Sequence, residues 1–184
     1  MSKKAIVIYN SKRGATKQYA EWIASELGCT LVSLENLDYG ALGQFDVVIF
    51  GSWLRGSGIV RFDKFRKQIT GFADKLIIFV TGISEYNPQN YQQICEINFK
   101  EEINMQNTLL YFCPGRYIPS EVKGLDKFLM AISKKVLISG ATDRSSESAA
   151  NKMVDAIVNG IDNVDKRYTE QVLRAARKRL KDES

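Results

Sequence analysis

Ala5-Ile-Val-Ile-Tyr9, followed directly by Asn10-Ser-Lys-Arg-Gly-Ala-Thr16, is the stretch of sequence that decides the fold. The first part is a continuous apolar run rich in β-branched residues, which is typical of a central parallel strand covered on both faces. The second part is a polar loop that leads into a helical pattern over residues 16–27. Together they predict the start of a βαβ unit, with the loop at the carboxyl end of the strand.

The same alternation of strand and helix continues along the chain. Further predicted strands span residues 29–33, 46–51, 75–80 and 108–113, of which the first is weaker and resembles an edge strand. Helical patterns lie between them, one marked by Phe62, Phe65 and Ile69, and one that begins at Asn87-Pro88. We therefore predict an α/β fold with three layers, in which helices cover both faces of a doubly wound, five-stranded parallel sheet.

The pattern changes after the fifth predicted strand. An amphipathic stretch predicts an insertion at about 115–140, and residues 145–157 predict the last helix that covers the sheet. A further helix, at about 164–180, exceeds what a five-stranded sheet requires. We therefore expect a single domain at 1–160 and an extra, basic C-terminal helix at 161–184.

Composition limits the chemistry. The 184 residues suit one domain, and the absence of histidine excludes Ser-His-Asp and Cys-His catalysis and His-ligated metal sites. Cys29, Cys95 and Cys113 show no CxxC spacing, so we expect reduced, buried thiols and no metal site. No apolar run approaches the ~18 residues of a membrane span. We expect a cytoplasmic protein, with contact to a membrane surface left open.

The loop at residues 10–16 has the chemistry of an anion site. Ser11 and Thr16 provide hydroxyl groups, Gly14 allows a close backbone approach, and the helix that follows offers N–H groups without an intrahelical partner. The loop lacks the GxGxxG and GxxxxGK[ST] patterns, which disfavours NAD and ATP. An ordinary capped turn is the alternative, because Ser and Thr are good N-caps.

Three loops at the ends of predicted strands together resemble those of the flavodoxin family. The pattern Tyr9-x-Ser-x-x-Gly-x-Thr-Lys17 resembles the FMN-phosphate loop of that family. Ser52-Trp-Leu-Arg-Gly-Ser-Gly58 is similar to its second flavin loop, and Thr81-Gly82, with Tyr86 after it, takes the place of the third. The resemblance implies FMN as the cofactor and the flavodoxin-like strand order 2-1-3-4-5.

The resemblance also implies which residues contact FMN. Hydroxyl and N–H groups at Ser11 and 14–16 suit the phosphate. Trp53 and Tyr86 are candidates to pack on the flat ring, with a core or interface position as the alternative for Trp53 and with Tyr91 close to Tyr86. The full set of expected cofactor-binding residues is Ser11, Arg13, Gly14, Ala15, Thr16, Ser52, Trp53, Leu54, Arg55, Gly56, Thr81, Gly82 and Tyr86.

The second loop carries two features that bear on redox chemistry. Gly56 and Gly58 allow a conformational change in which a backbone carbonyl accepts a hydrogen bond from the reduced flavin ring, or they simply make a flexible turn. Arg55 departs from the acidic surroundings typical of flavodoxins. We expect its positive charge to raise the reduction potential relative to an acidic site.

The chain is basic, with a formal net charge of +5, whereas small flavodoxin carriers are usually acidic. Cys113-Pro-Gly-Arg-Tyr117 and Leu125-Asp-Lys-Phe-Leu-Met130, together with Leu54-Arg55, resemble the menaquinone-dependent protoporphyrinogen oxidase branch. That resemblance implies oxidation of a tetrapyrrole with a quinone acceptor, contacts to either partner from Arg116 and Tyr117, and no catalytic residue that can be transferred. The alternatives are a simple electron carrier that serves a redox partner protein, and a flavin-free module that binds a partner.

The last twenty residues carry three of the five surplus positive charges. Leu173, Ala176 and Leu180 share one helical stripe with basic residues around it, so weak binding to an anionic membrane surface or partner is one interpretation. A helix packed on its own domain is the other. We expect no nucleic-acid binding, because the segment lacks interleaved aromatic residues apart from Tyr168.

Overall fold

The computed structural model of the chain describes residues 3–69, 73–83, 86–99, 109–140 and 149–181. The described strands are β1 (Ala5–Tyr9), β2 (Thr30–Ser33), β3 (Val47–Arg55), β4 (Gly58–Ile59), β5 (Leu76–Gly82), β6 (Leu109–Pro114), β7 (Arg116–Tyr117) and β8 (Ile161–Asp162). The described α-helices are α1 (Ala15–Leu27), α2 (Phe62–Gln68), α3 (Pro88–Asn98), α4 (Gly124–Gly140), α5 (Ala149–Asn159) and α6 (Glu170–Lys181). Short 3-10 helices are η1 (Leu34–Asn36), η2 (Tyr39–Gln44), η3 (Ala73–Lys75), η4 (Pro119–Glu121) and η5 (Lys166–Thr169).

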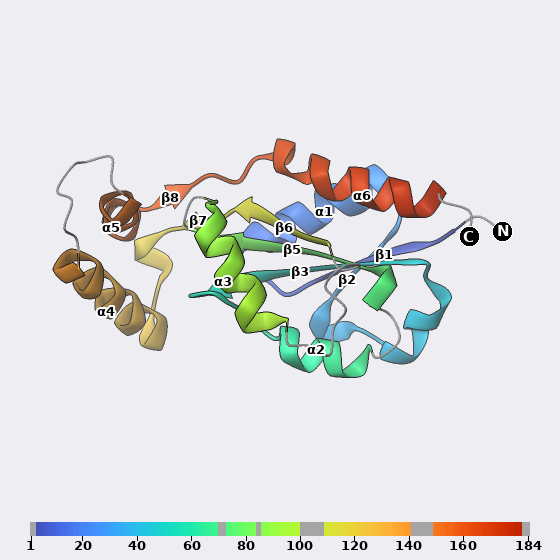
Figure 1. Cartoon of the computed structure of the whole chain (residues 1–184), viewed down its shortest axis with the longest axis horizontal. Coiled ribbons are helices and arrows are strands. Elements are labelled where there is room, and N and C mark those ends of the chain that lie inside the picture. Colours follow the sequence, from blue (N-terminus) through green and yellow to red (C-terminus); the bar gives the residue numbers. More distant parts are fainter. Residues whose placement is uncertain (1–2, 70–72, 84–85, 100–108, 141–148, 182–184) are drawn as a thin grey trace.

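Five parallel strands form the central sheet in the order β2-β1-β3-β5-β6 (Figure 1). Since β3, β5 and β6 are the third, fourth and fifth predicted strands, the order 2-1-3-4-5 is confirmed. The register places Tyr9 beside Gly51, Trp53 beside Thr81, and Gly82 beside Pro114. The segments that follow β1, β3, β5 and β6 therefore begin at one edge of the sheet.

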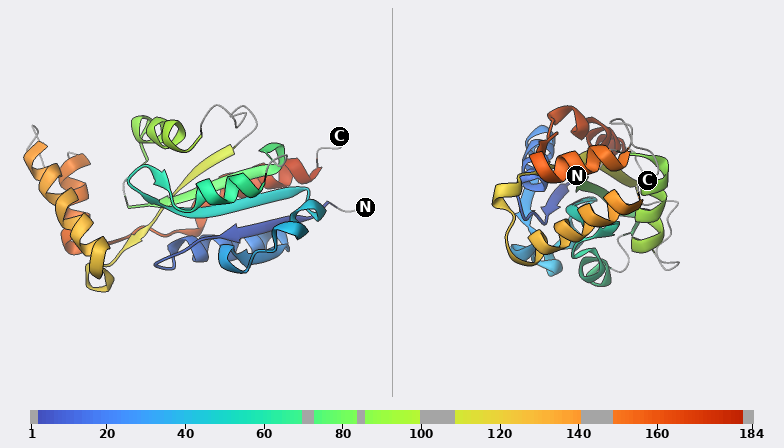
Figure 2. Two further views of the ribbon diagram at one scale, coloured as in Figure 1. Left: turned by 90° about the horizontal axis from the view of Figure 1, so that it is seen from below. Right: turned by 90° about the vertical axis from the view of Figure 1, so that its left-hand side faces the viewer.

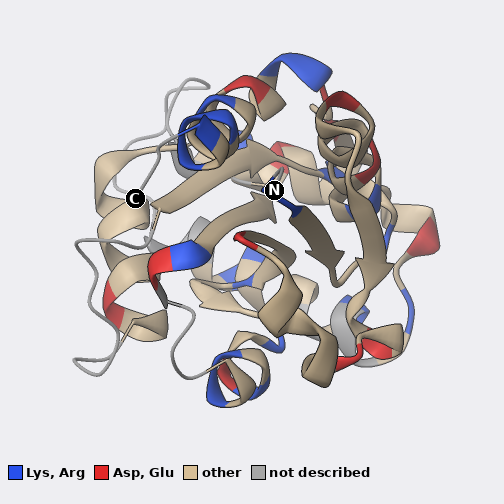
Figure 3. Cartoon of the chain, turned by 90° about the vertical axis from the view of Figure 1, so that its right-hand side faces the viewer, with Lys and Arg blue, Asp and Glu red and all other residues tan. Residues whose placement is uncertain are grey.

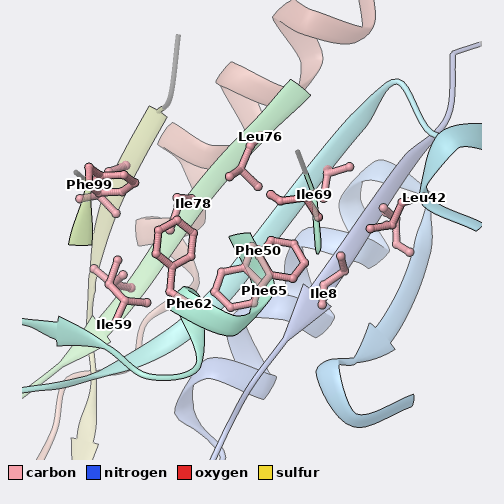
Figure 4. Close-up of a cluster of buried hydrophobic side chains, with 14 of the residues drawn as sticks. Ile8, Leu42, Phe50, Ile59, Phe62, Phe65, Ile69, Leu76, Ile78 and Phe99 are labelled. Carbon is pink, nitrogen blue, oxygen red and sulfur yellow. The ribbon is translucent and has the colours of Figure 1, made fainter. Parts of the chain in front are cut away.

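Helices cover both faces of this sheet, with α1 and α6 on one face and α2 and α3 on the other (Figures 1 and 2). Successive strand residues point to opposite faces. Ile49 packs with the α1 and α6 side, whereas Phe50 packs with the α2 side. On that side the rings of Phe50 and Phe65 stack with their centroids 4.2 Å apart (Figure 4). The sheet, its helices and η5 are called the sandwich below.

The helix α6 is the last to cover the sheet, which corrects the prediction that residues 145–157 do so. Val172, Leu173 and Ala176 of α6 are buried in the same cluster as Ile77 of β5. The segment predicted for this place contributes α5, which packs on α4 beyond the carboxyl ends of the strands (Figure 2); its residues 145–148 lie outside the described part of the chain. Both segments are amphipathic, and helical periodicity does not specify which surface an apolar face will meet.

A short antiparallel ribbon joins α4 and α5, called the helix pair, to the sandwich. In it β7 pairs with β8, and Arg116 lies opposite Asp162. This unit occupies the place where we expected an insertion at about 115–140.

Lys and Arg residues occur on several elements of the described part of the chain. Figure 3 shows Lys and Arg interspersed with Asp and Glu around the ribbon. On α6 the expected apolar stripe faces inward, since Leu173 and Ala176 are buried, while Arg174, Arg177 and Lys178 are exposed. An electrostatic contact of this helix with an anionic surface stays a prediction. None of the described helices is both long and apolar enough to span a membrane.

Candidate cofactor site at the strand ends

A cavity of about 240 Å³ lies where the strand ends meet the helix pair. Twelve of the fifteen residues expected to contact a cofactor, substrate or partner line it, namely Ser11, Arg13, Ala15, Thr16, Trp53, Leu54, Arg55, Gly56, Thr81, Gly82, Arg116 and Tyr117. The remaining three, Gly14, Ser52 and Tyr86, do not line it. The sheet register therefore brings together loops that are far apart in the sequence, whereas the role of each residue stays a prediction.

The first wall is the loop between β1 and α1. Gly14 is the N-cap of α1 with φ 87°, a left-handed conformation that favours glycine, and no side chain caps this helix end. The hydroxyl of Ser11 accepts a hydrogen bond from the backbone N of Gly14 at 3.2 Å, which shapes the turn. The first N–H groups of a helix have no intrahelical acceptor. The amino end of α1, at Ala15 and Thr16, therefore presents hydrogen-bond donors to an anion. Gly14 itself does not line the cavity but forms the turn that precedes α1.

Thr16 and Thr81 connect the first loop to the end of β5. Their hydroxyl oxygens lie 2.8 Å apart, and both residues are buried while lining the cavity. One hydroxyl hydrogen is used in this bond, so the pair retains one hydrogen that can be donated to a ligand. This arrangement suits an anionic oxygen better than an apolar group.

The second wall is a β-hairpin. Leu54 pairs with Ile59 and Arg55 pairs with Gly58, and Gly56 takes φ 57° at the turn. The loop that contains Gly56 and Gly58 is therefore the ordered turn of an antiparallel hairpin.

Two cations surround the ring of Trp53 in this wall. The Lys12 ammonium lies 5.8 Å and the Arg55 guanidinium 5.2 Å from the ring centroid. Both distances are within the range of a cation–π interaction. The mouth of the cavity is therefore aromatic and positively charged.

Ser52 supports the hairpin from below. It is fully buried, donates a hydrogen bond to the carbonyl of Val60 at 2.7 Å, and accepts one from the amide of Asn10 at 3.0 Å. The residue was expected to contact the cofactor, but its hydroxyl is engaged beneath the cavity wall. A role in fixing the base of the hairpin fits these contacts.

The third wall combines the ends of β5 and β6. The backbone N of Gly115 donates to the carbonyl of Gly82 at 2.7 Å, and a Cβ at Gly115 would lie 2.9 Å from that oxygen. Only glycine permits this approach. Tyr86 lies apart from the cavity with its side chain 60% exposed, and its ring packs near those of Tyr91 and Phe112.

Arg116 and Tyr117 lie at the base of the helix pair. Arg116 donates to Asp162 at 2.7 Å and to the side-chain oxygen of Gln18 at 3.3 Å, so it is held in place by an ion pair and a hydrogen bond. The guanidinium of Arg13 lies 5.8 Å from the ring centroid of Tyr117. These contacts connect the first loop to the helix pair through the cavity.

Six lining residues were not among the expected ones: Lys12, Ile83, Gly115, Met130, Ser133 and Met153. Lys12, Ile83 and Gly115 are neighbours of expected residues, so their strand-end position could have indicated them. Met130 and Ser133 come from α4 and Met153 from α5. Met130 ends the segment that resembles the oxidase branch, but the amphipathic pattern of α4 and α5 shows only that one face is covered and does not place these residues over the cavity. Met130, Ser133 and Met153 are called the roof of the cavity below.

Two titratable side chains lie behind the cavity, the Cys113 thiol and the Tyr19 hydroxyl. Burial raises the pKa of the Cys113 thiol to about 12, so the thiol is protonated at neutral pH. Burial also raises the pKa of Tyr19, whose hydroxyl donates to the carbonyl of Pro114 at 2.9 Å. Within the described ranges no three His, Cys, Asp or Glu side chains are placed to hold a metal ion. The residues at this site suit binding of an anion and a flat apolar group.

Comparison with known proteins agrees with this geometry. The family model described as a flavodoxin domain matches residues 6–145. A WrbA-like flavodoxin from Agrobacterium tumefaciens has a similar structure, with 16% identity, 97% of this chain and 99% of that chain covered, and a TM-score of 0.50. This likeness supports the fold.

Two other similar structures are flavodoxins. One, from the domain Archaea, is 18% identical, with 85% of this chain and 97% of that chain covered and a TM-score of 0.40. The other, oxidised flavodoxin 2 from Bacillus cereus, is 21% identical, with 72% and 99% covered and a TM-score of 0.41. No curated protein matches the chain.

Proposed function

The chain belongs to the flavodoxin domain family, and on that premise we propose that it binds FMN and works as a redox protein that transfers electrons. The observation that carries the proposal is the convergence of three strand-end loops on one cavity, with hydroxyl and N–H donors at one side and an aromatic ring at another. FMN would supply the redox chemistry that a chain without histidine and without a reactive thiol lacks.

The phosphate of FMN fits the first wall. Ser11, Thr16 and the amino end of α1 supply neutral donors, while Lys12 and Arg13 add positive charge. Hydrogen bonds to a charged phosphate are stronger than bonds between neutral groups. The donor set therefore suits a phosphate dianion, and the left-handed backbone of Gly14 supplies the turn that leads into the helix end.

The ring system of FMN fits between the second wall and the roof. Trp53 and Leu54 offer apolar surface from the hairpin, and Met130 and Met153 offer it from the helix pair. A flat aromatic plate gains most from such surfaces on its faces. We assign the ring contact to Trp53 in preference to Tyr86, because Tyr86 is exposed and packs outside the cavity.

The test is FMN titration of the purified protein, followed by visible absorption and by quenching of FMN fluorescence. Thr16→Val removes a hydroxyl from the cavity, whereas the matched control Thr169→Val removes a buried hydroxyl that donates to Lys166. We expect Thr16→Val to weaken FMN binding about tenfold or more, since a hydrogen bond to a charged group contributes about 1.5–3 kcal/mol, and Thr169→Val to leave it unchanged. A wild-type protein that stays colourless and does not quench FMN would refute the proposal and favour the flavin-free, partner-binding module.

Arg55 would tune the bound flavin. Its guanidinium lies beside Trp53 at the cavity, where positive charge favours an anionic reduced ring and raises the potential. We expect the midpoint potential of Arg55→Gln to fall by tens of millivolts in an anaerobic redox titration. Arg177→Gln, which removes a cation near Glu26 on the sandwich surface, is the control and should leave the potential unchanged. Equal potentials for Arg55→Gln and the wild type would remove this role.

A finer form of the proposal is an oxidoreductase that oxidises a protoporphyrinogen-type tetrapyrrole, passing a hydride to FMN and the electrons to a quinone. The helix pair supports it, because Met130 and Met153 add an apolar roof to a cavity that Arg13 and Arg116 also line. Such surroundings suit a large flat molecule with carboxylates. Steady-state oxidation of protoporphyrinogen with a menaquinone analogue tests this form. Fast electron exchange with a reductase, with no substrate turnover, would instead assign the chain as a simple carrier.

A further inference from the structure

Asn98, at the end of α3, is a buried polar residue that makes three hydrogen bonds. Its side-chain oxygen accepts from the backbone N of Ile59, and its amide nitrogen donates to the carbonyls of Ser57 and Ile94, each at 2.7 Å. The residue is 6% exposed. A buried amide without its partners costs about 1–3 kcal/mol, so these bonds strongly favour the observed position of the hairpin on α3.

The bonds of Asn98 reach the cavity through the hairpin. Ile59 pairs with Leu54 across β3 and β4, and Ser57 follows Gly56 in the chain. Leu54 and Gly56 line the cavity, whereas Asn98 does not. The position of the second wall therefore depends on a side chain that lies about forty residues further along the chain and outside the site.

The carbonyl of Ser57 is directed toward Asn98 by this arrangement. Gly56 and Gly58 flank that residue and would otherwise allow the local peptides to rotate with little steric cost. A rotation of the Ser57–Gly58 peptide that turned its carbonyl toward the cavity would first break the bond to Asn98. A second contact from the same helix, between the Ser57 hydroxyl and Gln93 at 3.3 Å, restrains the turn in the same direction.

We propose that Asn98 is a positioning residue that holds the β3–β4 hairpin in one conformation and thereby sets the affinity and reduction potential of the cofactor. The proposal rests on the FMN site described above. With Asn98 in place, the hairpin already has one fixed conformation. The carbonyl of Ser57 stays bonded to Asn98 and is not available to a reduced flavin ring. Loss of the restraint weakens binding and lets the carbonyl stabilise the reduced ring, which raises the potential.

The test compares Asn98→Leu with Ile94→Ala. Leucine has the same branched shape and number of side-chain heavy atoms as asparagine but no amide, whereas Ile94 lies on the same helix, is 3% exposed and packs in the core. Hydrogen exchange of the cofactor-free protein is measured at the Ile59 amide, FMN affinity by fluorescence, the midpoint potential by titration, and global stability by denaturant unfolding.

For Asn98→Leu we expect about tenfold faster exchange at Ile59, about tenfold weaker FMN binding and a higher midpoint potential. Ile94→Ala should lower global stability at least as much and leave affinity and potential unchanged. Unchanged FMN affinity in Asn98→Leu, or equal changes in both variants, would overturn the proposal. Should Asn98→Leu fail to fold, Asn98→Ser, which keeps one short hydrogen-bonding group, must show the same changes at smaller size.

The exchange measurement separates this inference from the function on which it rests. If the wild-type protein binds no FMN, the proposed function fails, and the cofactor role of Asn98 fails with it. Faster exchange at Ile59 in Asn98→Leu would still show that the residue restrains the hairpin. If FMN binds and Ile59 exchanges at the same rate in both proteins, only the inference about Asn98 is wrong.

Discussion

The sandwich and the helix pair both contain amphipathic helices, but the apolar faces of these helices are much more completely buried in the sandwich than in the helix pair. In the sandwich, Ile23 of α1 and Val172 of α6 are fully buried, because each helix lies on a broad sheet face. In the helix pair, Phe128 and Val136 of α4 are 62% and 61% exposed. The difference shows that amphipathic periodicity identifies an apolar face but not how completely the fold will cover it.

One difference between the two regions is expected at glycine positions. A Cβ at Gly51 in β3 would lie 2.0 Å from the Phe79 ring, so Gly51→Ala should cost about 3 kcal/mol of unfolding free energy or prevent folding. Gly124, which begins α4, has φ 58° and open space around it, so Gly124→Ala should cost only about 1 kcal/mol for its left-handed backbone. Denaturant unfolding measures both, and equal losses would contradict the contrast.

Phenylalanine truncations give a second and more direct comparison of the same two regions. Phe65 in α2 is fully buried against Phe50, so Phe65→Ala should lower the unfolding free energy by about 3–5 kcal/mol. Phe128→Ala, in the exposed face of α4, should change it by less than about 0.5 kcal/mol. A large loss for Phe128→Ala would mean that its ring is covered in solution, and the two regions would then no longer differ.

Alkaline pH should affect the sandwich through two thiols, the half-buried Cys29 and the buried Cys113. Burial raises the pKa of Cys29 to about 11 and that of Cys113 to about 12, from an ordinary value of 9.0. The unfolded chain loses these protons first, so the stability they contribute is complete below pH 9 and is lost as pH rises through 11 to 12. We therefore expect the unfolding free energy to fall as the pH rises from about 9 toward 12. Cys113→Ala should reduce that slope, and an unchanged slope would exclude Cys113 as a cause.

Much of the sandwich could be predicted from the sequence because its signals are local. Apolar runs such as Ala5–Tyr9 must be covered on both faces, and in a parallel sheet that requirement also places the loops at one edge. The prediction that residues 145–157 form the last helix on the sheet is wrong for a physical reason, whereas the interpretation of the C-terminal helix as packed on its own domain is confirmed. Both helices present an apolar face, but only α6 returns along the sheet, and the partner of such a face depends on distant residues.

The residues of the candidate site also divide into those that local sequence patterns indicate and those that depend on contacts between distant residues. Ser11, Thr16, Trp53 and Thr81 follow directly from strand ends, which is why sequence patterns indicated them. Asn98 could not be indicated in this way, since its partners Ser57 and Ile59 lie far from it in the chain and the helix around it carries an ordinary polar pattern. The methionines of the roof likewise depend on how the helix pair is placed.

The β7–β8 ribbon has a consequence for how this domain can change. The chain leaves the sandwich at Gly115 and returns at Asn163, and the backbone N of Asn163 donates to the carbonyl of Gly115 at 3.1 Å. Exit and entry are thus neighbours, so the intervening segment can be exchanged for one of another length without altering the strand order of the sheet. The helix pair that roofs the cavity can therefore be replaced or shortened while the strand order that holds the three loops stays the same.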